Sequence, residues 1–286
     1  MRQLIFLLLA CACGMGEAKP IRFLSFNVFG DWSYMSTYAC ERDAQQAQAI
    51  LKRQPDIVAF QEVTTNFWNS RLFSDLTGFE AVGRIGEWCN YTPLAYRADR
   101  FDLLDSGAER FHVELDKSKG FTWAVLKDRL DGQEVVTFST HFWFKRDGAA
   151  SDYIRVVNVR DIEAKVAALR AKHPDAAVFG GGDVNSLWGD ASLAEFAKFG
   201  YVDVQPTFPE KAKDASYHNI LERIPGTTRW KGFMPGEGGR PAGVTYDHVF
   251  FRADHVKPVS FCIDTEEDFR DASDHFPLVV DFEAVR

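Results

Sequence analysis

Six short polar segments end or interrupt apolar runs along this chain. The runs are rich in Val, Phe and Ile, a composition typical of strands buried within a sheet. A carboxylate, amide or imidazole at the end of such a strand loses hydration, which costs free energy unless a partner compensates it. The segments are FLSFNVFG with Asn27, IVAFQEV with Glu62, VVTFSTHF with His141, VFGGGDVN with Asp183 and Asn185, VTYDHVFF with Asp247, and ASDHFPLVV with Asp274 and His275. We therefore expect the strands to lie side by side, with their polar ends gathered in one active site around a hard metal ion.

The apolar pattern also predicts where the regular elements lie. Strands are expected at residues 21–27, 56–61, 93–97, 101–110, 121–130, 134–141, 176–182, 246–252, 256–263 and 276–283. Helices are expected at 41–53, where apolar residues recur at helical spacing, at 151–171, and near 190–198. Antiparallel neighbours in the middle of the chain, with helices between other pairs, indicate two packed sheets with helices outside.

No internal repeat, low-complexity tract or Pro/Ser-rich linker divides residues 19–286, which favours a single domain. Residues 205–245 are rich in Pro, Gly and charge and have few periodic apolar positions. We expect them to form a long functional loop, with aromatic side chains at Tyr217, Trp230 and Phe233.

Composition narrows the class of protein. A chain of 286 residues with 46% hydrophobic and 26% charged residues is an ordinary globular protein. Its formal net charge of −8 argues mildly against a long polyanion as the preferred ligand, because surfaces that bind nucleic acid usually carry a basic excess. An acidic site built for a divalent cation would itself contribute to this imbalance.

The first 18 residues have the layout of a secretory signal peptide: a charged start, a short apolar run over residues 4–10, and then small residues. Cleavage after Ala18 would release a chain that begins near Lys19. Alternatively, residues 8–11 loosely match a lipoprotein box with Cys11 as the lipid acceptor, but the Leu at its second position is unusual. We favour a secreted or periplasmic protein. No other segment is apolar for long enough to cross a membrane.

The remaining cysteines, Cys40, Cys89 and Cys262, lack the paired spacing of a zinc site. In an oxidising compartment Cys40 and Cys89 could form a disulfide and leave Cys262 buried and free. The odd number of cysteines leaves this pairing open.

In their order and spacing, the six polar segments resemble the endonuclease/exonuclease/phosphatase superfamily, which has the pancreatic deoxyribonuclease-like fold. The resemblance runs from about residue 21 to the end of the chain. It implies an α/β (α+β) four-layer sandwich of two packed, mainly antiparallel sheets flanked by helices. It also implies hydrolysis of a phosphoester with Mg²⁺ or Mn²⁺.

The expected metal ligands are Asn27, Glu62 and Asp274. Carboxylate and amide oxygens are the ligands that hard divalent cations prefer. Asn27 could instead merely cap a turn before Gly30, and Asp274 could cap the turn before the last strand. Only the joint pattern of all the segments favours the ligand interpretation.

The resemblance implies that Asp183 orients and deprotonates the attacking water and that Asn185 fixes the position of this water. His141 and His275 would hold the phosphoryl oxygens as hydrogen-bond donors. Asp247 would orient one of these histidines, and the sequence leaves open which one. We also expect Gly residues 180–182, just before Asp183, to permit close approach of the backbone to a ligand.

Several other residues have weaker signals. His112, His173, His218 and His255 are expected to be surface or loop residues, and His248 should face away from Asp247 because side chains alternate along a strand. Aromatic residues close after the polar segments could either stack on a substrate or pack in the core; they are Trp32, Trp143, Phe144 and Trp188.

One position departs from the resemblance. The DNA-repair branch usually carries an acidic residue two positions after the first Asn, and Phe29 stands there in this chain. Both this departure and the predicted signal peptide weaken an interpretation as a DNA-repair nuclease.

The sequence thus predicts a secreted, monomeric, metal-dependent phosphoric ester hydrolase acting on a small phosphoester, a lipid headgroup or nucleic acid. An extracellular nuclease, or a noncatalytic module that binds phosphate or lipid on the same scaffold, remains an alternative. A zinc enzyme of another fold is disfavoured by the lack of clustered His or Cys ligands.

Overall fold

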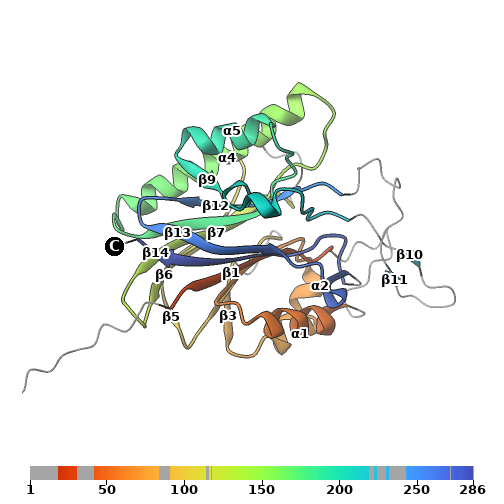
Figure 1. The fold of residues 1–286 in the computed structure, drawn as a ribbon, viewed down its shortest axis with the longest axis horizontal. Helices are drawn as coiled ribbons and strands as arrows, with labels where there is room; N and C mark the ends of the chain where they lie inside the picture. Colours follow the sequence, from red (N-terminus) through yellow and green to blue (C-terminus); the bar gives the residue numbers. More distant parts are fainter. Residues whose placement is uncertain are drawn as a thin grey trace, which may run out of the picture.

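Two packed six-stranded sheets with helices on their outer sides make up most of the regular structure (Figure 1), and a separate two-stranded sheet makes up the rest of the strands. The computed structural model describes residues 19–30, 42–83, 91–113, 116, 118–218, 222–223, 230–231, 243–270 and 272–285. The strands are β1 (Ile21–Asn27), β2 (Ile57–Gln61), β3 (Phe79–Val82), β4 (Leu94–Arg97), β5 (Phe101–Arg110), β6 (Gly120–Asp128), β7 (Glu134–His141), β8 (Ala177–Asp183), β9 (Tyr201–Asp203), β10 (Glu222–Arg223), β11 (Trp230–Lys231), β12 (Asp247–Arg252), β13 (Val256–Ile263) and β14 (Leu278–Ala284).

The first sheet has the strand order β13-β14-β1-β2-β4-β3, and the second has the order β5-β6-β7-β8-β12-β9. In each sheet one neighbouring pair is parallel, β1 with β2 and β7 with β8. The remaining neighbours in both sheets are antiparallel. This confirms the expected α/β (α+β) sandwich of two mainly antiparallel sheets flanked by helices.

Helices lie on both sides of the sheet pair (Figure 1). They are α1 (Asp43–Arg53), α2 (Thr65–Trp68), α3 (Arg71–Asp75), α4 (Ala149–Arg170), α5 (Ala191–Lys198) and α6 (Glu267–Arg270), with 3-10 turns η3 (Gln205–Thr207) and η4 (Pro209–Lys211). Helices α4 and α5 contact each other and strands of the second sheet. Helices α1 and α2 lie on the opposite side, next to the first sheet.

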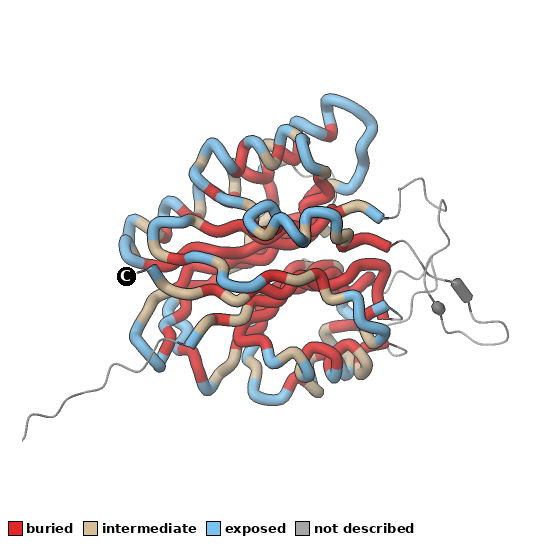
Figure 2. Tube along the Cα trace, viewed as in Figure 1, coloured by how far each residue is buried: buried red, intermediate tan, exposed pale blue. Residues whose placement is uncertain are grey.

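Aromatic side chains fill the space between the two sheets. The ring of Phe179 on β8 lies 5.6 Å from that of Phe23 on β1 and 4.4 Å from that of Phe282 on β14. All three are buried, and Figure 2 shows that buried positions run along the central strands of both sheets. Burying one such side chain stabilises the fold by about 1.5–3 kcal/mol relative to leaving it exposed. These aromatic contacts therefore hold the two sheets packed face to face.

Polar side chains join the sheets near the ends of β2 and β7. The hydroxyl of Ser139 donates to the carbonyl of Phe60 at 2.7 Å, and the amide of Gln61 donates to the Ser139 hydroxyl at 3.2 Å. These buried bonds satisfy groups that would otherwise be costly to desolvate. They fix the end of β2, which precedes Glu62, beside the end of β7, which carries His141.

The glycines of β8 serve strand packing, which corrects our expectation of an approach to a ligand. A Cβ at Gly181 would lie 2.1 Å from the carbonyl oxygen of His248 on β12, and a Cβ at Gly182 would lie 2.0 Å from that of Thr140 on β7. Gly182 also has φ +153°. Side chains at these positions would push away the strands on either side of Asp183.

Several sequence predictions lie outside the described residues. They are the signal peptide at 1–18 with Cys11, the possible disulfide between Cys40 and Cys89, and the aromatic residues Trp32 and Phe233. Cys262 is a free thiol and half-buried rather than fully buried. Within the described ranges, no helix combines the length and the apolar composition needed to span a membrane.

Candidate active site

The two parallel strand pairs bring the predicted site residues together at one end of the sheet pair, where these strands terminate. Asn27 ends β1, and Glu62 directly follows its parallel neighbour β2. His141 ends β7 and Asp183 ends its parallel neighbour β8, in register with each other. Asp247 begins the antiparallel strand β12 and is the register partner of Asp183. Residues 274–275 come just before β14, the other neighbour of β1.

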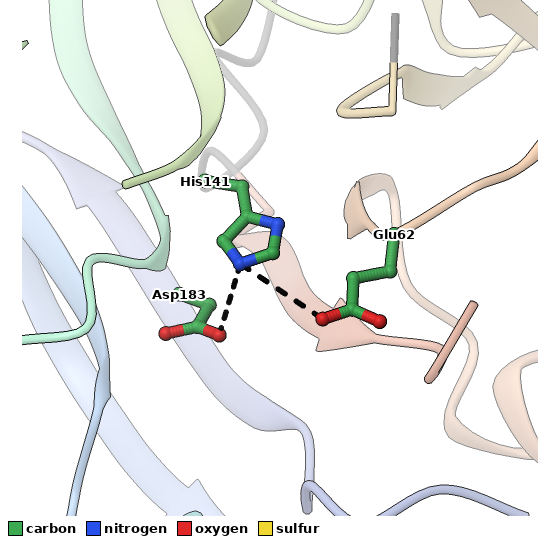
Figure 3. A group of neighbouring side chains, drawn as sticks. All are labelled: Glu62, His141 and Asp183. Atoms are coloured by element: carbon green, nitrogen blue, oxygen red, sulfur yellow. Dashed lines mark ion pairs between the residues drawn. The ribbon is translucent and has the colours of Figure 1, made fainter. Parts of the chain in front are cut away.

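Glu62, His141 and Asp183 form the first cluster (Figure 3). His141 Nε2 lies 3.4 Å from Asp183 Oδ2 and 3.9 Å from Glu62 Oε1. One ligand atom from each of the three residues lies within 4.8 Å of the other two. His141 and Asp183 are buried, and Glu62 is partly exposed. The cluster therefore opens toward solvent on the side of Glu62.

Asn27 lies between the two carboxylates of this cluster. Its amide nitrogen donates to Asp183 Oδ2 at 3.1 Å and approaches Glu62 Oε1 at 3.3 Å. Its amide oxygen accepts from the backbone N–H of Phe29 at 3.0 Å. In this geometry Asn27 orients two acidic groups that would repel each other if both were charged. Its oxygen would have to turn to become the metal ligand that the sequence predicts.

Asp183, Asp247 and His275 form the second cluster, which shares Asp183 with the first. His275 Nδ1 lies 2.7 Å from Asp247 Oδ2, and its Nε2 lies 3.9 Å from Asp183 Oδ2. The hydroxyl of Ser216 also donates to Asp247 Oδ2, at 2.6 Å. The pairing that the sequence left open is therefore between Asp247 and His275.

The environment of His275 favours its charged form. Burial of the ring would lower its pKa, but the negative charges of Asp247 and Asp274 and the hydrogen bond to Asp247 outweigh burial. Together these effects raise the pKa of His275 to about 10. At neutral pH the ring is therefore a cation with Nδ1–H directed at Asp247. Asp274 acts on His275 through its charge but belongs to neither cluster.

Left-handed backbone conformations occur at three residues of this edge that are not glycine. Glu62 has φ 61°, Asn185 has φ 50° and Phe29 has φ 56°. Each such conformation costs of order 1–3 kcal/mol and persists only where its surroundings enforce it. The enforcing contacts include Gly30 N–H donating to Glu62 Oε2 at 2.9 Å and Asn185 N–H donating to Asp183 Oδ1 at 3.0 Å.

Asn185 presents an acceptor beside Asp183. Its amide nitrogen donates to the carbonyl of Phe142 at 3.1 Å, which fixes the direction of its amide oxygen. That oxygen is buried and has no hydrogen-bond donor among the residues that the structure describes. A buried polar atom of this kind is costly in a core and common where a ligand or water binds.

Sequence reasoning missed Lys119. This lysine is only 9% exposed, and its Nζ lies 2.8 Å from His141 Nε2 and 3.1 Å from His141 Nδ1. It comes directly before β6, whose first residue, Gly120, is the register partner of His141. The signal in the sequence is a basic residue at the start of a buried strand next to the strand that ends in His141.

His248 confirms the expected alternation along β12. Its Nδ1 lies 2.6 Å from Asp203 Oδ2, and its Nε2 lies 3.0 Å from the carbonyl oxygen of Ser186, whereas its neighbour Asp247 contacts His275. Burial would lower the pKa of His248, but the charge of Asp203 outweighs burial and raises it. His248 thus holds the carbonyl of Ser186, just after Asn185, on the face of β12 opposite to Asp247.

His218 lies in a loop, one of its two expected placements, but it is buried rather than at the surface. It is 8% exposed, and its ring lies 4.2 Å from that of Phe276. Burial and the nearby charge of His275 lower the pKa of His218 to about 4. Its backbone N–H donates to the carbonyl of Asp274 at 3.1 Å. His218 is therefore neutral at pH 7 and borders the site.

The expected aromatic positions differ in exposure. Phe144 is 38% exposed and Trp188 is 44% exposed, so both offer surface to a ligand. Lys119 Nζ lies 5.7 Å from the centroid of the Phe144 ring. Trp143 is half-buried, and its indole N–H donates to the Ser151 hydroxyl at 3.2 Å. Phe144 therefore lies beside Lys119, the lysine that contacts His141.

Comparisons with known proteins agree with this fold. A structure of an endonuclease/exonuclease/phosphatase from Bacteroides vulgatus superposes with a TM-score of 0.71 at 21% identity, over 94% of this chain and 100% of that one. The mannosyl-6-phosphatase of Bacteroides thetaiotaomicron VPI-5482 gives 0.65 at 18% identity, over 93% and 100%. TDP2 from D. rerio, complexed with a single-strand DNA product, gives 0.62 at 17% identity, over 92% and 99%.

The sequence comparisons are of two kinds. The search of curated proteins found no match. The model of the endonuclease/exonuclease/phosphatase family matches residues 24–275, a range that starts within β1 and ends at His275. This span includes both clusters, and the chain belongs to the endonuclease/exonuclease/phosphatase family.

Proposed function

We propose that this protein hydrolyses a phosphoester by attack of a water molecule that Asp183 activates. The observation that carries the proposal is that two clusters share Asp183. One is acidic and opens to solvent on the side of Glu62, and the other holds a charged imidazole. The first suits a divalent cation and the second suits a phosphoryl oxygen. Membership of the family supports the same reaction class.

The residues present fit Mg²⁺ or Mn²⁺. Glu62 and Asp183 approach the same amide nitrogen of Asn27 at 3.3 and 3.1 Å, so their negative charges are close together. Such a pair of carboxylates is stabilised by a cation. Glu62 would hold the ion, with Asn27 and Asp274 as the further predicted ligands. When bound, the ion would neutralise the phosphoryl group and stabilise charge on the leaving oxygen.

Asp183 and Asn185 would act on the water. Asp183 Oδ1 accepts from the Asn185 N–H, and Oδ2, which also accepts from the Asn27 amide, would be the proton acceptor. The buried amide oxygen of Asn185 would accept a hydrogen bond from the same water and fix its position. The proton then passes from the water to Asp183 as the oxygen attacks phosphorus in line with the leaving group.

His275, His141 and Lys119 would hold the phosphoryl oxygens. His275 donates from Nε2 because Asp247 occupies its Nδ1. Lys119 places an ammonium group 2.8 Å from His141 Nε2, so its positive charge would face the phosphoryl group beside His141. Charge that builds up on these oxygens in the transition state would meet donors already in place.

Replacing Lys119 with Met is expected to lower kcat/KM by about 10–100-fold, because a hydrogen bond to a charged group contributes about 1.5–3 kcal/mol. Lys119→Arg should retain part of the activity. Lys127→Met, an exposed position on the same strand β6, is the matched control and should match the wild type. Steady-state kinetics on the three variants test this role, and a Lys119→Met variant as active as Lys127→Met would refute it.

A panel of phosphoesters tests which class of substrate the protein hydrolyses. Purified protein is assayed with Mg²⁺, with Mn²⁺ and with EDTA against DNA, RNA, sphingomyelin, and nitrophenyl phosphomonoesters and diesters. The net charge of −8 favours a small phosphoester or lipid headgroup over nucleic acid. Hydrolysis of DNA or RNA alone would support an extracellular nuclease. Binding of phosphate or lipid in a calorimetric titration, with no turnover of any substrate, would overturn hydrolysis in favour of a noncatalytic module.

We further propose that residues 1–18 are a signal peptide and that the mature chain, 19–286, is exported as a single domain. The charged start and the apolar run over residues 4–10 support this. N-terminal sequencing of the protein from an exporting host should begin near Lys19. A cytoplasmic protein that retains Met1 would contradict it.

A further inference from the structure

Arg42 and Gln46 hold two separate backbone segments together at the edge of the site. The guanidinium of Arg42, which is only 5% exposed, donates to the carbonyls of Val28 and Ala272, both at 2.8 Å, and to that of Phe29 at 2.6 Å. One helical turn later, the buried amide of Gln46 donates to the same carbonyls of Val28 and Ala272, at 2.9 and 2.8 Å. We call these two side chains the α1 clamp, because Arg42 directly precedes α1 and Gln46 lies in its first turn.

The first clamped segment supports Asn27 and Glu62. Val28 and Phe29 directly follow Asn27, and the next residue, Gly30, donates its N–H to Glu62 Oε2 at 2.9 Å. The N–H of Val28 donates to the carbonyl of Gln61, the residue before Glu62, at 3.1 Å. A shift of this segment would therefore move both the amide of Asn27 and the carboxylate of Glu62.

The second clamped segment supports Asp274 and His275. Ala272 comes two residues before Asp274, and the next residue, Ser273, donates its hydroxyl to the carbonyl of Asn27 at 2.6 Å. The same hydroxyl accepts from the N–H of His275 at 3.1 Å. The α1 clamp thus joins residues from opposite ends of the chain that the site needs at a fixed separation.

Phe29 contacts the α1 clamp through both its carbonyl and its ring. Its left-handed backbone, with φ 56°, turns its carbonyl toward Arg42. The Arg42 guanidinium lies 5.4 Å from the centroid of the Phe29 ring and 5.3 Å from that of Phe67 on α2, within the range of cation–π contact. The position where the DNA-repair branch usually has an acidic residue is occupied here by a ring that packs on the α1 clamp.

We propose that Arg42 and Gln46 are positioning residues for the divalent-cation site. This rests on the proposed function, since it assigns the α1 clamp to the ion that Glu62 would hold. Neither side chain contacts the ion or the substrate. They set the distance between Glu62 and residues 274–275 through four backbone carbonyl bonds to Val28 and Ala272. Partners that orient metal ligands in this way commonly control metal affinity.

Direct binding of Mn²⁺ to EDTA-treated, dialysed protein tests the proposal, with free Mn²⁺ measured by electron paramagnetic resonance. Arg42→Met should weaken Mn²⁺ binding by about 10–100-fold, and Arg42→Lys should restore part of the loss. Arg100→Met is the matched control. Arg100 is 6% exposed, pairs with the buried carboxylates of Asp56 and Asp128, and donates to the carbonyls of Lys19 and Pro20, at the end of β1 opposite to Asn27. This control should lower the unfolding temperature but leave Mn²⁺ affinity unchanged.

Each outcome is decisive. Folded Arg42→Met protein, judged by circular dichroism, with wild-type Mn²⁺ affinity would overturn the role of the α1 clamp and leave the proposed function intact. If Arg42→Met does not fold, Gln46→Met decides, since it removes one donor to each segment; weaker Mn²⁺ binding supports the proposal and unchanged binding overturns it. Wild-type protein that binds no Mn²⁺ would overturn both the α1 clamp and the proposed metal site.

Discussion

An Asp183→Asn variant is expected to lose nearly all turnover of the phosphoester that the wild-type protein hydrolyses, with kcat lower by about 10²–10⁴-fold. Asp183 is the one residue shared by both clusters, and its Oδ2 lies within 4 Å of Asn27 Nδ2, His141 Nε2 and His275 Nε2. An Asn side chain has the same shape and can still accept from the Asn185 N–H. It cannot accept the proton of the attacking water, so the chemical step fails.

Steady-state kinetics separate this effect from a loss of binding. The value of kcat should fall while KM changes little, because the carboxylate acts in the transition state. Asp281→Asn is the matched control, since Asp281 lies on β14 and pairs with Arg22 and Ser260 away from the site. It should retain wild-type kcat. If Asp183→Asn retains kcat within about tenfold of the control, then Asp183 is not the base.

The sequence predicted the bounds of several long strands, although only β7 among them is buried along nearly its whole length. The bounds expected for 101–110, 134–141 and 256–263 agree with β5, β7 and β13. It missed β3 and β9, which are short strands at the edges of the two sheets. Most residues of β3 and β9 are partly exposed, so no apolar run marks them.

The sequence could also identify most of the residues that converge, but not their partners. The pairing of Asp247 with His275 depends on the turn before β14 and on the register of β12 against β8. Neither can be read from an apolar pattern. Lys119 was missed because a single lysine before a strand is usually solvated, and only the register of β6 against β7 brings it to His141.

The Gly180–Gly182 run shows how a local rule can indicate the wrong partner. Adjacent glycines permit close approach of any group to the backbone. Because this run directly precedes Asp183, the sequence suggested that the approaching group would be a ligand. The structure places the carbonyls of neighbouring strands there instead. The run allows β7 and β12 to lie close to β8, and this closeness brings His141 and Asp247 to Asp183.

Removal of divalent cations is expected to abolish hydrolysis, and Glu62→Gln should reproduce most of this loss with cations present. Glu62 is the partly exposed carboxylate of the first cluster, and it lies 3.9 Å from His141 Nε2 and 3.3 Å from Asn27 Nδ2. A Gln side chain keeps the shape and an oxygen that can accept from Gly30 N–H, but it lacks the charge that attracts the ion. We expect kcat at saturating Mg²⁺ to fall by about 10²–10³-fold, the usual cost of losing one electrostatic element of a transition-state site.

The measurement is activity as a function of Mg²⁺ concentration after EDTA treatment and dialysis. Wild-type activity should return on addition of Mg²⁺ or Mn²⁺, whereas Glu62→Gln should need a higher concentration and reach a lower maximum. Glu134→Gln is the matched control, because Glu134 begins β7 at the end opposite to His141 and pairs there with His173. Full activity in EDTA would exclude a required cation. A Glu62→Gln variant with the same Mg²⁺ dependence as Glu134→Gln would instead leave the cation in place and transfer its coordination to Asp183, the other carboxylate of the first cluster.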